Sequence, residues 1–490
     1  LPNYRARGAG AVEYVLDGVP YVALGTDSLA VDPVWLPLSM LDRVEIETWP
    51  GQLRVHLVTR RNDRLAARSL IGLGRGTNSL TKFEAQLEMR SRKGLTFSLA
   101  ADYYNTGDVP SVSSAGDFYR NTALWLQLGY VPSPRKGVVA QVLRGGPRRL
   151  SPTGDEAAPD AVDGRRNDYL VRGFLRSRDD GTGTGADLFL GLSSWDGADV
   201  EIQQTVGHVG GTLSLRGATS SASLTAAWRS RWTPLDARAQ VAWSPAPAFS
   251  LRGEAAYQMH SESRSAAWVG GNVSLGLVGP IRVLGSARAG SILLTPAIAD
   301  AESQSVVDLS GAVAWESRPF MLQVGITRTD AFEPTAFPTF SGTVQSIAPV
   351  PGLNWLSVKG RITPVNWLSV QGWFDTPLDV TPEGQPIDHL VGEAEIRSKF
   401  LRRFQSGAFD LRLSMGWERW GIGVMGMSPE GVVVNQTSQN YFRFRLQFAI
   451  QSFTAYLERY NMNNQVTGYV PGRPIFGNSQ IFGVRWGFLN

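Results

Sequence analysis

Residues 441–450 read YFRFRLQFAI, and this stretch decides the fold class. Every second residue from Phe442 to Ile450 is apolar, whereas Tyr441, Arg443 and the next alternate positions are polar as far as residue 447. Side chains of a β-strand point alternately to its two faces, so this strand has one apolar face and one polar face. Such a strand separates two different solvents.

The same alternation recurs along most of the chain. It is clear in residues 82–90 and 409–418, and similar segments follow one another from about residue 64 to the end. Their length of about 10–12 residues matches a tilted strand that crosses a membrane. A large soluble all-β protein is the alternative, but the number and length of the segments argue against it.

We predict an all-β membrane protein, in which about 22 antiparallel strands close into a transmembrane β-barrel. Gly210 and Gly211 could divide the segment 198–216, but one long strand keeps the count even and both barrel ends on the periplasmic side. The strands are expected near 65–72, 79–90, 94–104, 119–130, 136–143, 167–177, 185–194, 198–216, 221–231, 235–243, 248–258, 265–276, 281–290, 305–315, 320–328, 353–362, 366–375, 389–400, 409–419, 439–449, 453–461 and 479–489.

The connections between these strands alternate in length. Short ones such as 244–247 carry proline, which cannot donate to a β-ladder, and the long ones include 144–166, 329–352 and 427–438. Outer-membrane barrels have short periplasmic turns and longer outer loops, so we expect the long segments on the outer face. Aromatic girdles are expected at Tyr130, Trp243, Phe400 and Phe488 on the periplasmic side and at Phe374 and Trp417 on the outer side.

The composition excludes several other classes of protein. There is no cysteine, so disulfides, thiolate metal sites and a cysteine nucleophile are ruled out. The mean hydropathy is −0.12, and no run of about 18 apolar residues could form a helical membrane span. The 47 basic and 43 acidic residues are dispersed, which argues against a nucleic-acid partner.

No catalytic, metal or cofactor site is expected, and the chain is not predicted to be an enzyme. The pair His260-Ser261 lacks the partnered acid and the strand–turn–helix elbow of a hydrolase. The glycine repeat at 181–185 joins two strands and is not followed by a helix. We therefore predict a turn there rather than a phosphate-binding loop. The four histidines lack metal-ligand spacing; they are His56, His208, His260 and His389.

Residues 1–63 show a different pattern and form a candidate domain of their own. This small α/β unit is too short to hold a large core alone. A barrel of about 22 strands encloses a lumen too wide for side chains to fill, so we place the unit inside a barrel formed by residues 64–490. Its elements are expected at Val12–Leu16, 19–24, 36–41 (helical), 44–47 and 53–59.

Four stretches of this segment carry a family resemblance. They are 4–8 (YRARG), 14–20 (YVLDGVP), 36–46 (LPLSMLDRVEI) and 55–61 (VHLVTRR). In this order, and directly before a large barrel, they resemble the second half of the plug domain of TonB-dependent outer-membrane receptors. The chain departs from the family at 49–52, where a Gly-rich stretch is missing, and the TonB box and the first plug half do not occur in the sequence.

The resemblance implies a gated importer of a scarce solute in the cell outer membrane. It also implies a TonB-type energy-coupling protein as a partner, through a segment that precedes Leu1. Outer-membrane lipid and lipopolysaccharide are further expected partners, and a surface protein or lipoprotein is another. Two alternatives stay open: a passive channel or porin with a vestigial plug, and a structural barrel that anchors surface proteins.

Two sets of residues are candidates for contact with the solute. The first lies on a polar loop of segment 1–63 that faces outward in the family's orientation, or else is a solvated connector: Thr26, Asp27, Ser28, Asp32 and Trp35. The second lies on the inward face of neighbouring strands: Glu393, Glu395, Arg397, Lys399, Asp410, Arg412, Glu418, Arg443 and Arg445. We interpret this second set as a cross-strand ladder of ion pairs that lines a wet lumen and touches the plug, with direct solute contact as the alternative.

Overall fold

The computed structural model describes residues 12–22, 24, 35–49, 51–61, 64–107, 119–149, 162–197, 204–294, 296–297, 301–332, 352–379, 388–427, 432–436, 438–465 and 477–489. In this part of the chain, 22 strands form one closed barrel of antiparallel neighbours, as predicted. The strands are β5 (Arg68–Gly76), β6 (Thr81–Arg90), β7 (Leu95–Thr106), β8 (Tyr119–Ser133), β9 (Lys136–Arg149), β10 (Val162–Arg176), β11 (Gly183–Gly197), β12 (Gln204–Arg216), β13 (Ser220–Arg229), β14 (Leu235–Ala246), β15 (Phe249–Met259), β16 (Ser265–Gly276), β17 (Ile281–Ile292), β18 (Gln304–Glu316), β19 (Phe320–Thr329), β20 (Leu353–Val365), β21 (Leu368–Pro377), β22 (His389–Ser398), β23 (Phe409–Trp420), β26 (Gln439–Ile450), β27 (Phe453–Tyr460) and β28 (Ser479–Leu489).

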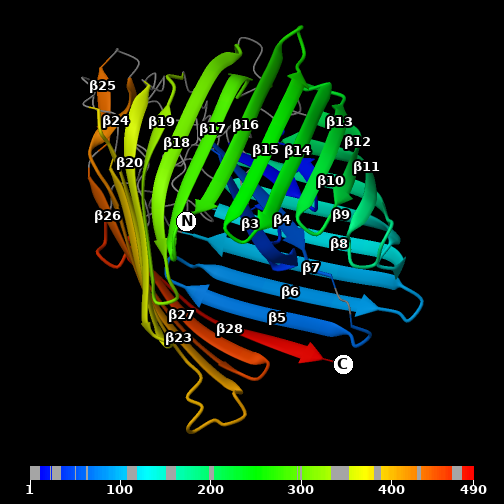
Figure 1. Cartoon of the computed structure of the whole chain (residues 1–490). Coiled ribbons are helices and arrows are strands. Elements are labelled where there is room, and N and C mark those ends of the chain that lie inside the picture. Colours follow the sequence, from blue (N-terminus) through cyan, green and yellow to red (C-terminus); the bar gives the residue numbers. More distant parts are fainter. Residues whose placement is uncertain are drawn as a thin grey trace.

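The first and last barrel strands close the sheet. β28 pairs with β5 from Ile481 opposite Gly76 to Leu489 opposite Arg68. Every barrel strand therefore has a hydrogen-bonding neighbour on both sides, which a hydrocarbon environment requires of a spanning sheet. Figure 1 shows the resulting wall and the short strands that it encloses.

The exterior of the barrel is apolar. On β11, Leu188 and Leu190 are 69% and 61% exposed, whereas Phe189 between them is 4% exposed and points inward. Trp243 and Trp417, which the sequence assigns to the two aromatic girdles, are exposed as well. The alternation of the sequence thus places apolar side chains toward lipid and leaves the polar ones for the lumen.

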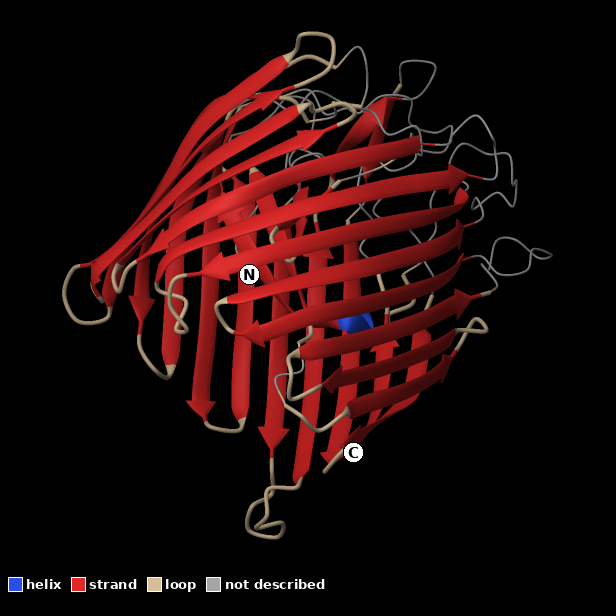
Figure 2. Cartoon of the chain, turned by 90° about the vertical axis from the view of Figure 1, so that its right-hand side faces the viewer, coloured by secondary structure: helices blue, strands red, loops and turns tan. Residues whose placement is uncertain are grey.

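The two ends of the barrel differ in their connections (Figure 2). At one end, which we call the turn end, short connections such as 134–135 and 451–452 join the strands. At the other, the loop end, connections such as 107–118 and 330–352 are longer. The ten-residue connection 399–408 is the longest at the turn end. Which end faces outward stays a prediction.

The structure corrects three predicted boundaries. Gly210 and Gly211 lie inside β12, which is one strand but begins at Gln204. The predicted loop 144–166 shrinks to 150–161, because β9 continues through its Gly-Gly-Pro sequence and keeps its pairing with β8. The predicted loop 427–438 contains part of a separate hairpin, formed by β24 (Gly423–Met427) and β25 (Val433–Gln436).

Inside the barrel lies a small four-stranded sheet, which we call the inner sheet. Its order is β2-β1-β4-β3, and only the β1–β4 pair is parallel. The expected α/β unit is wrong in one respect: the helical pattern at 36–41 forms a single 3-10 turn, Leu38–Met40, which lacks a side-chain cap. No helix in the described residues is long and apolar enough to cross a membrane. The strands are β1 (Val12–Leu16), β2 (Val19–Tyr21), β3 (Leu41–Trp49) and β4 (Gln52–Thr59).

The inner sheet shares its core with the barrel. Leu16 and Leu57 of the sheet and Met40 of the 3-10 turn form one buried cluster with Trp125 and Leu143, which point inward from β8 and β9. A segment this short cannot bury enough apolar surface by itself, so the barrel wall completes the core. The division of the chain into a plug of residues 1–63 and a barrel of residues 64–490 stays a prediction.

Candidate functional site in the barrel lumen

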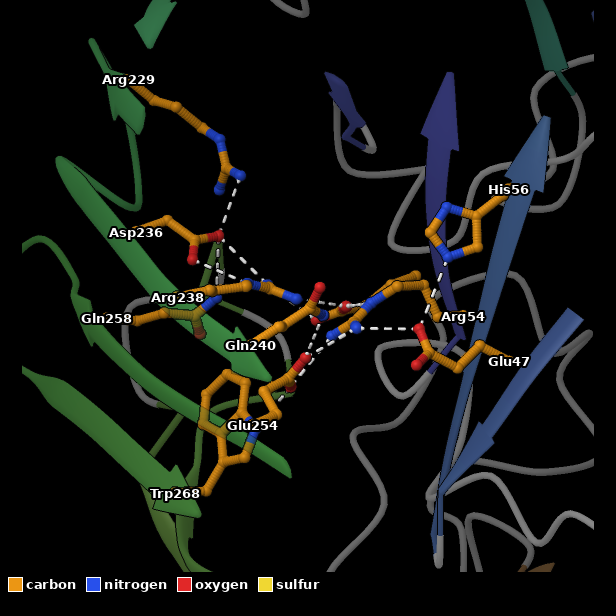
Figure 3. A network of polar contacts seen from close by, with 11 residues as sticks. Glu47, Arg54, His56, Arg229, Asp236, Arg238, Gln240, Glu254, Gln258 and Trp268 are labelled. Atoms are coloured by element: carbon orange, nitrogen blue, oxygen red, sulfur yellow. Dashed lines mark hydrogen bonds and ion pairs between the residues drawn. The ribbon is translucent and has the colours of Figure 1, made fainter. Parts of the chain in front are cut away.

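A buried network of charges joins the inner sheet to the barrel, and we call it the latch (Figure 3). At its centre, Arg54 of β4 donates to both carboxylate oxygens of Glu254 on β15, at 2.8 and 3.1 Å. The same guanidinium also reaches Glu13 at 3.0 Å and Glu47 at 3.2 Å. The side chains of Arg54 and Glu254 are only 3% and 2% exposed, so this charge pair is removed from water.

Strands β13 and β14 extend the latch. Arg238 donates to Glu13 at 2.7 and 3.0 Å and to Asp236 at 2.9 Å, and Arg229 reaches the same aspartate at 3.1 Å. Amide and indole donors complete the network, because Gln240 and Trp268 both donate to Glu254, at 2.7 and 3.3 Å. A buried ion pair is stable only when its remaining lone pairs are also satisfied, and this network meets that condition.

The charges fix the ionisation of the inner-sheet residues. Burial alone raises the pKa of Glu13, but Arg238 and Arg54 outweigh it and hold that pKa well below its usual range. Burial likewise disfavours the charged form of Arg54, yet Glu13 and Glu254 raise its pKa. Both groups are therefore charged at neutral pH, and the latch works as a set of ion pairs.

Further contacts hold the inner sheet along the same side of the barrel. The hydroxyl of Tyr21 donates to Asp168 at 3.1 Å, and the Arg166 guanidinium lies 3.9 Å from the centre of the Tyr21 ring. The backbone N–H of Ser39 donates to Asp102 at 3.0 Å. The described hydrogen bonds and ion pairs from the inner sheet end on β6–β15, which we call the contact wall.

The opposite side of the barrel, formed by β22, β23 and β26–β28, carries the candidate charges of the sequence. Arg443 pairs with Glu393 at 3.1 Å, and Arg445 pairs with Glu458 at 3.1 Å. Arg412 pairs with Glu395 at 2.5 Å. These side chains thus form ion pairs between barrel strands, and we call this set the ladder. It also includes two further ion pairs, Arg397–Asp410 and Arg485–Glu84.

Only one of the candidate solute contacts on the loop of segment 1–63 lies within the described residues. Thr26, Asp27, Ser28 and Asp32 lie outside the described residues. Trp35 is described, and it is buried: its ring stacks on Trp195 of β11, with 5.2 Å between centroids. Trp35 therefore packs against the contact wall in this structure.

Solved structures share this architecture at low sequence identity. The FrpB iron transporter from Neisseria meningitidis has a TM-score of 0.71 and 9% identity, over 98% of this chain and 92% of the other. The fold is that of the TonB-dependent receptors. The siderophore receptor PirA from Acinetobacter baumannii agrees, with a TM-score of 0.72 and 10% identity over 99% and 91% of the chains. So does a ferric enterobactin receptor mutant from Pseudomonas aeruginosa, with 0.69 and 10% over 98% and 92%.

The sequence itself matches no protein-family model and no curated protein. The resemblance that four short stretches suggested is thus supported by the fold of an outer-membrane receptor barrel. The three structural neighbours are transporters and receptors rather than enzymes, which agrees with the expectation for this chain.

Two glycines of the barrel let ion pairs cross an intervening strand. Gly416 lies between Glu393 and Arg443 in the register of β22, β23 and β26, and an added Cβ there would lie 2.3 Å from Arg443 Nε. Gly72 lies in the same way between Arg485 and Glu84. The sequence alone did not predict this arrangement, although its signal is an inward-facing glycine flanked by long charged residues on both neighbouring strands.

Two cavities flank the inner sheet, and neither is predicted by the sequence. The first, of about 260 Å³, lies between the β3–β4 turn and β17–β21. Its lining mixes small residues with larger polar and aromatic side chains; it includes Trp49, Ser310, Gln323, Ser357, Lys359 and Trp373. The second, of about 540 Å³, lies between β3–β4 and β12–β15. Its lining includes Glu47, Trp49, His56, Ser223, Gln240 and Arg252. Within the described residues, no group of three acidic or histidine side chains could hold a metal ion.

Proposed function

We propose that this outer-membrane plugged-barrel transporter imports a scarce solute by an energy-coupled route, with residues 1–63 acting as the plug. The observation that carries the proposal is the latch. A folded sheet held inside a wide barrel by buried, compensated charges blocks free passage, and a barrel of this size is otherwise too wide for its side chains to fill. A barrel that is blocked in this way can transport a solute only if the passage past the inner sheet is opened in a controlled manner.

The solute and its contacts belong to the same proposal. Two of the structural neighbours are an iron transporter and a siderophore receptor, so a ferric chelate is the first solute to test. The loop with Thr26, Asp27, Ser28 and Asp32 is the proposed plug contribution to binding. A TonB-type protein is the proposed coupling partner, and lipopolysaccharide and a surface lipoprotein are proposed outer partners.

Uptake in cells tests this proposal. Cells that express the chain should accumulate a radiolabelled ferric chelate, and a protonophore should abolish the accumulation. Uptake that persists with the protonophore and does not saturate favours a passive channel instead. The two cavities beside the inner sheet are the observation that keeps this second candidate open, because they provide space for small solutes without removal of the sheet.

A further inference from the structure

Trp49 lies where the two cavities meet. Among the described residues, it alone lines both the cavity at β17–β21 and the cavity at β12–β15. The first cavity reaches Thr329 and Asp375, near the loop end, and the second reaches Arg216 and Ser221, near the turn end. A solute that moved from one cavity to the other along the inner sheet would have to pass this side chain.

The barrel strand behind Trp49 is shaped to receive its ring. The indole lies over Gly270 of β16, where an added Cβ would be 3.2 Å from the six-membered ring. β16 lies between the strands that line the two cavities, so the ring covers the boundary between them. A glycine at this inward position provides the space in which the indole rests.

The indole is held by packing rather than by a polar anchor. Trp49 is 5% exposed, yet its Nε1 makes no hydrogen bond with a described residue. An unpaired buried N–H is unfavourable, so rotation of the ring into a polar cavity gains a hydrogen bond while it opens the boundary. Trp49 is also the last residue of β3, opposite Gln52 across the tight turn that contains Gly51 at φ +69°.

We infer that Trp49 is a gate on a solute path that runs between the inner sheet and the barrel, from the cavity at β17–β21 to the cavity at β12–β15. The path is bounded by the latch, which stays closed while the ring moves. This inference rests on the proposed transport function, because it places the route of the solute. It does not depend on energy coupling, since a gate of this kind would serve a passive channel equally.

Single-channel conductance of the full chain in planar bilayers with KCl tests the gate. Trp49→Ala removes the ring and should raise the conductance several-fold, whereas Trp49→Phe keeps a ring over Gly270 and should stay close to the wild type. Trp243→Ala is the matched control, because that indole faces lipid and lines neither cavity. Resistance of the inner sheet to trypsin in each variant shows that the latch is intact.

The absence of native cysteine makes a second test specific. Trp49→Cys should conduct like the alanine variant, and a charged methanethiosulfonate reagent should then reduce its conductance, with recovery after reduction. Unchanged conductance in Trp49→Ala with a protected inner sheet would overturn the gate. If the conductance data support the gate but the protonophore does not reduce uptake of the ferric chelate, the proposal of energy-coupled import is wrong. The path would then be that of a passive channel.

Discussion

The latch and the ladder are built from the same residue types, arginine with glutamate or aspartate, but they differ in burial. Arg54 in the latch is 3% exposed, whereas Arg443 in the ladder is 51% exposed. A buried pair loses a large amount of free energy when one partner is removed, whereas an exposed pair is worth little. Burial, rather than residue type, therefore distinguishes the ion pairs that hold the inner sheet in place from those that line the solvated lumen.

The largest effect is expected from a break in the latch. Glu254→Gln replaces one carboxylate beside the buried Arg54 with a neutral amide. Loss of one partner of a buried pair costs about 3–5 kcal/mol when the charge is left uncompensated, and Glu13 and Glu47 still face Arg54, so this range is the upper limit of the expected loss. The inner sheet should then become sensitive to trypsin in detergent. Glu393→Gln is the control in the ladder, where the cost is about 0–1 kcal/mol because the partner is half exposed. Equal protection of the sheet in both variants would contradict the comparison.

Acid should weaken the latch and leave the strands of the barrel intact. The folded-state pKa of Glu13 is lower than its usual value of 4.5. Its stabilising effect is therefore complete above pH 4.5 and is lost as the pH falls toward the lowered pKa. Pepsin digestion between about pH 4.5 and pH 2 should release inner-sheet fragments increasingly at the lower pH. In Glu13→Gln the release should depend less on pH, and an identical pH profile would speak against the role of Glu13.

A smaller effect is expected at the glycine that the ladder crosses. Gly416→Ala places a Cβ where Arg443 now passes, so the arginine must leave Glu393. The loss is that of a half-exposed pair, about 1 kcal/mol or less, and should appear as a slightly lower unfolding midpoint in urea. Gly392→Ala is the matched control on the neighbouring strand, because an added Cβ there meets open space. A larger loss in the control would show that strand propensity dominates.

The smallest effect concerns ion selectivity. The basic excess of the barrel predicts a mild preference for anions, but the ladder compensates most of the arginines that face the lumen on β22–β28. Arg443→Ala together with Arg412→Ala should therefore move the reversal potential in a KCl gradient slightly toward cation selectivity. Clear cation selectivity in the unmodified barrel after deletion of residues 1–63 would contradict the prediction.

The sequence predicts the barrel and the ladder because both depend on local patterns. Alternation in single strands locates them, and Arg412 and Glu395 are neighbours across one antiparallel strand pair. The latch could not be predicted in this way, since Arg54 and Glu254 are 200 residues apart in the sequence. In the sequence, each of them is an ordinary polar residue of an alternating strand. Only the folded barrel brings the two side chains together.

The cavities and the 3-10 turn could not be predicted from the sequence, for related reasons. The first cavity is lined by residues of five barrel strands and by residues of the inner sheet such as Trp49, so no single segment marks it. The pattern at 36–41 has helical spacing, but β3 begins at Leu41 because its pairing with β4 competes for the same backbone groups. Tertiary pairing decided these elements, and the local pattern did not.

The conductance of the chain without residues 1–63 tests the central claim most directly, namely that the inner sheet occupies the lumen and limits passage. Single channels of the deleted protein, measured in planar bilayers beside the full chain, should show a large rise in conductance, and cells that carry it should become more sensitive to large antibiotics. A full chain whose conductance is already high, and does not change on deletion, would contradict the account and leave a passive channel in its place.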